Sequence, residues 1–149
     1  MADSLVDTNV LVYAADPRDR AKQTAAAELL EGLIAAQRAV LSVQCLTEFY
    51  SVVTRRLREP IAPQQALGWV EQFARACRVL DLTSAVALEG LRGCARYELS
   101  SWDALIWSAA KLNQIPYILT EDAPHGRVLE GVRYLNPFDP TFDPLVLSA

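Results

Sequence analysis

The sequence predicts an α/β fold in which helices cover both faces of a central parallel sheet. Short segments rich in β-branched and aromatic residues alternate with longer segments whose apolar residues recur at helical spacing. This alternation is typical of parallel strands joined by helices. No repeat or linker divides the 149 residues. We therefore expect one domain over residues 1–149, with a core over about residues 4–138 and an extended tail over residues 139–149.

Five segments are expected to form strands, namely residues 4–7, 39–42, 78–82, 116–120 and 132–135. Five helices are expected near residues 19–37, 43–58, 63–77, 84–97 and 101–113. In the first of them, apolar residues recur at i, i+3 and i+4 from Ala26 to Ile34. Pro60 and Pro63 separate the second helix from the third, because proline breaks a helix interior.

Two of these helices have faces that bear on function. The helix near residues 101–113 is apolar around most of its circumference, Trp102 and Leu112 included, so we expect it to be largely buried. The helix near residues 43–58 has an apolar stripe and a polar stripe, and the polar one contains Gln44, Thr47, Glu48, Ser51 and Arg55. That polar stripe either faces solvent or lines a cleft.

Composition argues against a membrane-spanning, secreted or zinc-binding protein. No apolar run reaches the ~20 residues needed to cross a bilayer, and the acidic N-terminus does not resemble a secretory signal. The three cysteines lack the spacing of a zinc or redox motif and are expected to be reduced core thiols. We therefore expect a cytoplasmic protein that does not associate with membranes. A net charge of −4 argues, by itself, against a nucleic-acid partner.

Two acids follow predicted strands. Asp7 ends the first strand and precedes Thr8-Asn9, while Asp122 follows the strand at residues 116–120. Each can be explained as a turn residue, and Asp7 also as a helix N-cap. Together they suggest more, because open α/β sheets bind ligands at the carboxyl ends of strands, where strand order reverses. If the fourth strand returns to pair with the first, Asp7 and Asp122 become neighbours.

Two further acids lie on predicted helices. Asp103 is three residues after Ser100, so it fits the first turn of a capped helix. Glu48 lies on the polar stripe, where solvent exposure is the ordinary explanation. Convergence of these two acids with Asp7 and Asp122 would raise their pKa values through repulsion unless a cation neutralised them. Carboxylate oxygens without histidine or cysteine ligands favour Mg²⁺ or Mn²⁺ over zinc.

The order of motifs resembles that of PIN domains, the nuclease fold of VapC-type toxins in type II toxin–antitoxin systems. The matching segments are VDTNVLVYA, LTEFYSVV, SSWDALIWSAA, ILTEDAPHG and YLNPF, which together span residues 4–138. The resemblance implies a three-layer α/β/α fold with strand order 3-2-1-4-5. It carries the acids of the family's catalytic and metal site over to Asp7, Glu48, Asp103 and Asp122, with Asn9 and Thr120 in support. Because Glu121 precedes Asp122, either could face the metal.

The resemblance also implies a function. We expect a Mg²⁺- or Mn²⁺-dependent endoribonuclease that hydrolyses RNA phosphodiester bonds and leaves 5′-phosphate and 3′-hydroxyl ends. Asp7 and Asp103 would be the main ligands, with Glu48 and Asp122 placing a second ion or orienting water. A VapB-type antitoxin and a second copy of the chain, forming a homodimer, are the expected protein partners.

The negative net charge is compatible with RNA binding, because the four proposed ligands account for it and bound ions would reverse the local sign. Arg55, Arg56 and Arg58 are candidates for phosphate contact, although a solvated helix end also explains them. Two other functions stay open: a non-catalytic PIN-like interaction module, and an aspartate-based phosphotransfer protein. The second is disfavoured because Asn9 occupies the position of the second aspartate in a phosphatase motif.

Overall fold

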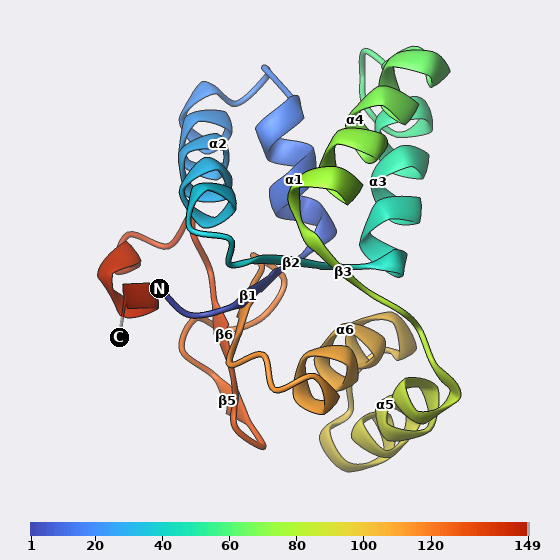
Figure 1. Ribbon diagram of the computed structural model, residues 1–149, viewed down its shortest axis with the longest axis vertical. Helices are drawn as coiled ribbons and strands as arrows, with labels where there is room; N and C mark the ends of the chain where they lie inside the picture. The colour runs from blue at the N-terminus through green and yellow to red at the C-terminus, as the bar shows by residue number, and fades with distance from the viewer. Residues whose placement is uncertain (149) are drawn as a thin grey trace.

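A computed structural model describes residues 1–148 and shows an α/β fold with six helices and a six-stranded, mostly parallel sheet (Figure 1). The strands are β1 (Ser4–Val6), β2 (Ala39–Ser42), β3 (Arg78–Leu80), β4 (Tyr117–Leu119), β5 (Val128–Leu129) and β6 (Val132–Leu135). The helices are α1 (Thr8–Ala15), α2 (Arg20–Ala35), α3 (Val43–Arg55), α4 (Pro63–Ala76), α5 (Ser84–Tyr97) and α6 (Ser101–Leu112), followed by the 3-10 helix η1 (Pro144–Ser148).

The sheet has the strand order β3-β2-β1-β4-β6-β5, and only the β5–β6 pair is antiparallel. Helices α1 to α4 cover one face, and α5 and α6 cover the other (Figure 1). The chain moves outward from β1 to β3 and then returns to add β4 beside β1, where Val6 is paired with Leu119. This reversal places the residues after β1 and β4 side by side, as the sequence predicts.

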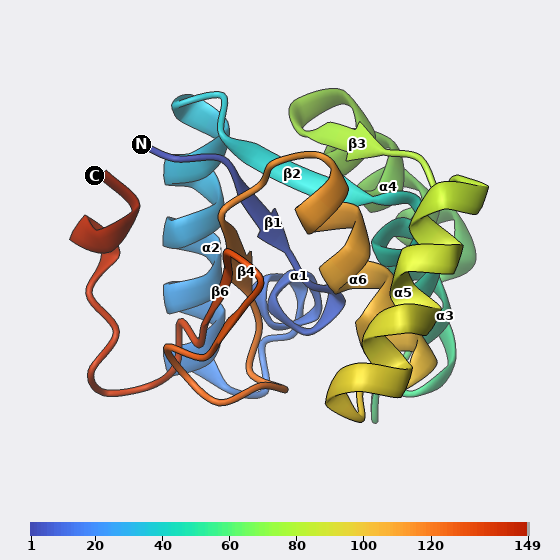
Figure 2. The same ribbon diagram turned by 90° about the horizontal axis from the view of Figure 1, so that it is seen from below.

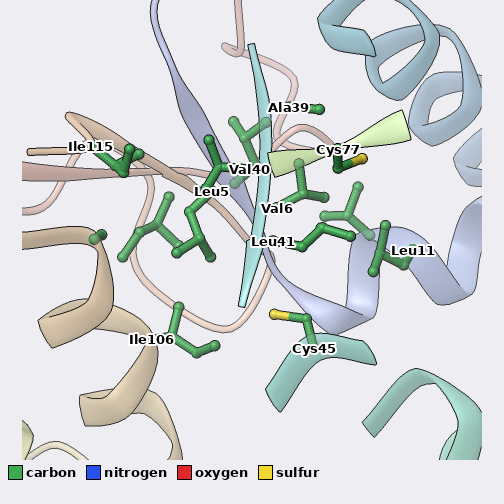
Figure 3. Packing of buried hydrophobic residues seen from close by; sticks show 14 of the residues in the cluster. Leu5, Val6, Leu11, Ala39, Val40, Leu41, Cys45, Cys77, Ile106 and Ile115 are labelled. Atoms are coloured by element: carbon green, nitrogen blue, oxygen red, sulfur yellow. The ribbon is translucent and has the colours of Figure 1, made fainter. Parts of the chain in front are cut away.

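The core lies on both faces of the central strands. Leu5, Val6 and Leu41 are fully or almost fully buried, and Figure 3 shows side chains of β1 and β2 packed toward Leu11 and Ile106 from helices on either side. Such continuously apolar strands are typical of a parallel sheet covered by helices. The sheet therefore gives the two inner strand ends a rigid base.

Helices α5 and α6 lie side by side in a close pair (Figure 2). Gly93 permits this approach, because a Cβ atom there would lie only 2.6 Å from Cζ3 of Trp107. The indole N–H of Trp107 donates to the carbonyl oxygen of Leu129, and Ser108 Oγ donates to that of Val86. These contacts fix α6, which carries Asp103, against α5 and the sheet.

The structure differs from the expectations in three places. Residues 8–15 form α1, which the expected helices did not include, although it agrees with the interpretation of Asp7 as a helix N-cap. Strand β5 was missed because it has only two residues and pairs with β6 across Glu130 and Gly131, both at positive φ. The tail over residues 139–149 is not simply extended in its described part: Asp139 and Asp143 side chains accept backbone hydrogen bonds two residues on, and η1 follows.

The expected burial of α6 also needs correction at its ends, since Trp102 is 64% exposed and Leu112 is 44% exposed. The middle of the helix, including Trp107, is buried against α5 and the sheet. Trp102 lies in the first turn and does not belong to the core cluster. None of the helices within residues 1–148 is long and apolar enough to cross a membrane.

Candidate active site

Asp7 lies between β1 and α1 and is the N-cap residue of that helix. Its Oδ1 accepts a hydrogen bond from the backbone N–H of Thr8 at 2.7 Å, as N-cap carboxylates do. Its Oδ2 accepts a hydrogen bond from the hydroxyl of Thr120 at 2.8 Å. Asp7 is therefore a helix cap, and its carboxylate also faces the end of β4.

Asn9 and Thr120 join the ends of the two inner strands. The Asn9 side-chain amide donates to Thr120 Oγ1 and to Asp122 Oδ2, both at 3.0 Å. Thr120 is buried, and its hydroxyl oxygen accepts the backbone N–H of Asp122 at 3.1 Å. Residues about 110 positions apart in the chain thus form one hydrogen-bonded cluster around the Asp7 carboxylate.

The adjacent acids Glu121 and Asp122 have different surroundings. Glu121 accepts hydrogen bonds from the Tyr13 hydroxyl at 2.7 Å and from Lys22 Nζ at 2.9 Å. The bond to Glu121 raises the pKa of Lys22 to about 12. Asp122 has no basic partner among the ion pairs of the described chain. Of the two acids, only Glu121 is therefore held in an ion pair.

Asp103 lies in the first turn of α6, where its backbone N–H donates to Ser100 Oγ at 3.2 Å. The capping role predicted for this pair is present, and the Asp103 side chain is left exposed. Asp103, Asp7 and Asp122 line one cavity of about 200 Å³, which we call the acidic cavity. Three of the four predicted acids therefore border the same space.

The electrostatics of the acidic cavity centre on Asp7. Burial raises the pKa of its carboxyl from 3.8 to about 6, hydrogen bonds from Thr120 and Thr8 oppose that rise, and the charges of Asp122 and Glu48 add to it. No ion pair of the described residues involves Asp7, Glu48 or Asp103. Ionisation of Asp7 therefore costs free energy in this fold, and a cation bound next to the carboxylate would offset that cost.

Glu48 is separated from this cavity by Thr8. The Thr8 hydroxyl donates to Glu48 Oε2 at 2.8 Å, and the Gln44 side-chain amide donates to Glu48 Oε1 at 3.0 Å. Glu48 lines a second cavity of about 470 Å³, which we call the Trp102 cavity; its other lining residues are Gln44, Thr47, Ser51, Val52, Arg56 and Trp102. The polar stripe of α3 thus lines a cleft, and Thr8 forms hydrogen bonds with both Glu48 and Asp7.

The three candidate arginines do not act as one group. All are exposed, and Arg56 lines the Trp102 cavity at the carboxyl end of α3. Arg55, which the helical pattern had favoured for phosphate contact, does not line either of these two cavities, and neither does Arg58. Of the three candidates, the structure therefore places only Arg56 at one of these two cavities.

Sequence analysis did not predict Arg127 and Tyr134, which also line the acidic cavity. Arg127 is five residues after Asp122, and this proximity was the only signal in the sequence. Tyr134 belongs to β6 and is 6% exposed, and its hydroxyl has no hydrogen-bond partner within the described chain. Burial raises the pKa of this phenol above its usual value.

The donor set fits a hard divalent ion without forming a complete cage. Within residues 1–148, no group of three or more Asp, Glu, His or Cys side chains is arranged to hold a metal ion. Mg²⁺, however, is usually held by one or two carboxylates together with water and substrate phosphate. Asp7 with Asp103 or Asp122 meets that requirement, and the uncompensated charge of Asp7 favours it.

Comparison with known proteins places this geometry in context. The PIN domain family matches residues 4–128. A toxin–antitoxin complex from Klebsiella pneumoniae contains a chain with 18% identity and a TM-score of 0.68, and the match covers 92% of this chain and 99% of that one. For DNA-bound VapBC from Salmonella typhimurium the values are 20% identity, a TM-score of 0.66, and coverage of 90% and 97%.

A third structure, VapC20 from Mycobacterium tuberculosis, is described as a toxin that cleaves the Sarcin-Ricin loop. It has 17% identity and a TM-score of 0.61, with 78% of this chain and 87% of that one covered. The comparison with curated proteins gives no match. At these identities the likeness to the solved structures concerns the fold.

Proposed function

The chain belongs to the PIN domain family, and from this premise we propose that it is a metal-dependent endoribonuclease, the toxin of a VapBC-type pair. The observation that carries the proposal is the acidic cavity, where one carboxylate after β1, one after β4 and one on α6 border the same space and have no basic ion-pair partner. A purely structural cluster of acids would be expected to form ion pairs, as Glu121 does with Lys22.

Each residue has a proposed role. Asp7 and Asp103 would hold Mg²⁺ or Mn²⁺, and Asp122 would orient water. Glu48, which the sequence had placed with a second ion, lies outside the acidic cavity and would act on it through its charge. When bound, such an ion lowers the pKa of water and offsets the charge that develops on the phosphorus oxygens. Asn9 and Thr120 keep the Asp7 carboxylate in one orientation through their hydrogen bonds.

Arg127 supplies the positive charge that the acids lack. It lines the acidic cavity, and a guanidinium group there would bind a nonbridging oxygen of the scissile phosphate. This role belongs to Arg127 rather than to Arg55 or Arg58, which do not line the acidic cavity. The overall charge of −4 therefore does not prevent a local contact with RNA.

Protein partners follow from the same proposal. Solved structures that share this fold include toxin–antitoxin complexes, some with DNA. For this chain we propose a VapB-type antitoxin that blocks the acidic cavity. We also propose that the chain forms a homodimer and acts on RNA in the cytoplasm.

Cleavage of RNA tests the proposal directly. Total RNA incubated with the purified chain and Mg²⁺ or Mn²⁺ should yield fragments with 5′-phosphate and 3′-hydroxyl ends. Chelation of the ions, Asp7→Asn and Asp103→Asn should each abolish the fragments. RNA left intact with either ion would favour the non-catalytic interaction module instead.

A further inference from the structure

The Trp102 cavity lies next to the acidic cavity. Trp102 and Asp103 are consecutive residues in the first turn of α6, yet Trp102 lines the Trp102 cavity and Asp103 lines the acidic cavity. The two spaces are therefore adjacent at this turn. If an RNA strand is bound with one phosphate at the acidic cavity, its neighbouring nucleotides would reach the Trp102 cavity.

Trp102 is the most exposed of the three tryptophans. Its side chain is 64% exposed, whereas Trp107 is fully buried and Trp69 packs against the aromatic rings of Phe49 and Phe73. Keeping a large indole in water forgoes the stabilisation that its burial would give. The backbone carbonyl of Trp102 also accepts a hydrogen bond from the Gln44 amide at 3.2 Å, so the turn that presents the indole is attached to α3.

Helix α3 forms the opposite wall of the Trp102 cavity. Residues 44, 48, 52 and 56 recur every four positions, and Thr47 and Ser51 form a parallel row. From Gln44 to Arg56 this wall is about 18 Å long, given the rise of about 1.5 Å per helical residue. It offers hydroxyl groups in the middle, where the Glu48 carboxylate is bonded to Thr8 and Gln44, and a guanidinium group at the far end. A base could therefore lie along the middle of the wall and a phosphate at the Arg56 end.

Gln44 supplies a second, independent observation. It is 4% exposed, and its Nε2 donates to both Glu48 and the Trp102 carbonyl, which fixes the orientation of the amide. Its Oε1 has no hydrogen-bond partner among residues 1–148. A buried acceptor without a partner destabilises a fold, and Gln44 is one of the residues that line the Trp102 cavity. Amino and imino groups of nucleobases are hydrogen-bond donors.

We propose that the Trp102 cavity binds an unpaired nucleotide of the RNA strand next to the cleavage site, with its base stacked on Trp102 and a neighbouring phosphate paired with Arg56. Stacking on an aromatic ring accepts every base, so Trp102 strengthens binding to single-stranded RNA broadly. Hydrogen bonds from the base to Gln44 Oε1, Thr47 or Ser51 add preference among bases. This inference rests on the proposed ribonuclease function.

Tryptophan fluorescence of the Asp7→Asn chain, which should not cut RNA, provides the test. A short single-stranded RNA of mixed sequence should quench the fluorescence, because Trp102 is the most exposed indole. In the same background, Trp102→Leu should remove the quenching and weaken binding of a labelled RNA on the order of tenfold, and Trp102→Phe should recover most of the affinity. Arg56→Gln should reduce the slope of log affinity against log salt concentration by about 0.7.

Leu88→Ala is the matched control, since Leu88 is 57% exposed on α5, and it should leave RNA affinity unchanged. Thermal unfolding with and without Mn²⁺ should be the same for Trp102→Leu as for the wild type in the active background, which separates binding from folding. An unchanged RNA affinity in Trp102→Leu, with an altered oligomeric mass, would assign the indole to an interface between copies and overturn the proposal.

The two proposals can fail separately. If the wild-type chain leaves RNA uncut with Mg²⁺ and with Mn²⁺, the ribonuclease function fails, and the nucleotide site fails with it. If the wild-type chain cuts RNA and Trp102→Leu binds and cuts it equally well, only the nucleotide site is wrong.

Discussion

Glu121 and Asp7 are both carboxylates at the ends of the inner strands, but their surroundings are opposite. Glu121 is paired with Lys22 and Tyr13, and Lys22 also lies over the Tyr13 ring, 4.5 Å from its centroid. Asp7 is surrounded by neutral donors and by other acids, and its pKa is raised to about 6. The comparison shows that one acid is paired with a cation inside the fold and the other is not, and an unpaired acid of this kind is a candidate ligand site.

The largest expected effect of this difference is on catalysis. Asp7→Asn should reduce RNA cleavage by on the order of 100-fold or more, because the variant loses a metal ligand while it keeps the N-cap oxygen. Glu121→Gln should change the cleavage rate by less than about threefold, since Glu121 contacts Tyr13 and Lys22 instead of the acidic cavity. Equal losses in both variants would remove the distinction between the two acids.

Asp7→Asn should lose activity but gain stability when divalent ions are absent. The folded-state pKa of Asp7 lies above 3.8, so the folded chain binds more protons than the unfolded chain, and stability falls as pH rises from about 4 to 6. Asp7→Asn should therefore be more stable than the wild type at pH 7, by up to about 3 kcal/mol. The two should converge near pH 4 in chemical denaturation, and a difference that does not depend on pH would contradict this explanation.

The Glu121 cluster should respond as an ordinary structural contact. Glu121→Gln, or Lys22→Met as its counterpart, should lower the free energy of unfolding by about 1 kcal/mol, because both side chains are only partly buried. High salt should reduce the difference between Glu121→Gln and the wild type. Loss of activity per folded molecule in either variant would show that the cluster belongs to the active site.

The smallest effect concerns the Thr120 hydroxyl. Its hydrogen bond lowers the pKa of Asp7, so Thr120→Val should raise that pKa further and shift the acidic limb of the pH–rate profile upward. The expected loss of stability is about 1 kcal/mol. Thr54→Val is a suitable control, because Thr54 bonds only to carbonyl groups of its own helix, α3. A profile that does not move in Thr120→Val would contradict the proposed link.

The sequence was most informative where a feature depends on topology. The positions of Asp7 and Asp122 follow from strand ends and from the return of β4 to β1, and both could be inferred from the alternation of strands and helices. Helix α1 was missed because VLVYA is apolar at every position and lacks helical periodicity. Strand β5 is too short to give a pattern.

Side-chain placement was less predictable for a physical reason. A helical stripe specifies which face of α3 is polar, but the rotation and depth of the helix decide whether Glu48 reaches Asp7 directly or through Thr8. The same freedom explains why Arg56, and not Arg55, lines the Trp102 cavity. Tyr134 and Arg127 come from a hairpin whose position depends on tertiary packing, so the sequence could not assign them to the site.

Thermal unfolding with and without Mn²⁺ tests the central claim most directly. An ion that binds the folded state alone should stabilise the wild type and Glu121→Gln equally, by about 2.7 kcal/mol at a concentration of 100 times Kd. The same ion should not stabilise Asp7→Asn, despite the greater stability of that variant without metal. Equal stabilisation of all three proteins, or of none, would contradict the assignment of Asp7 to a metal site.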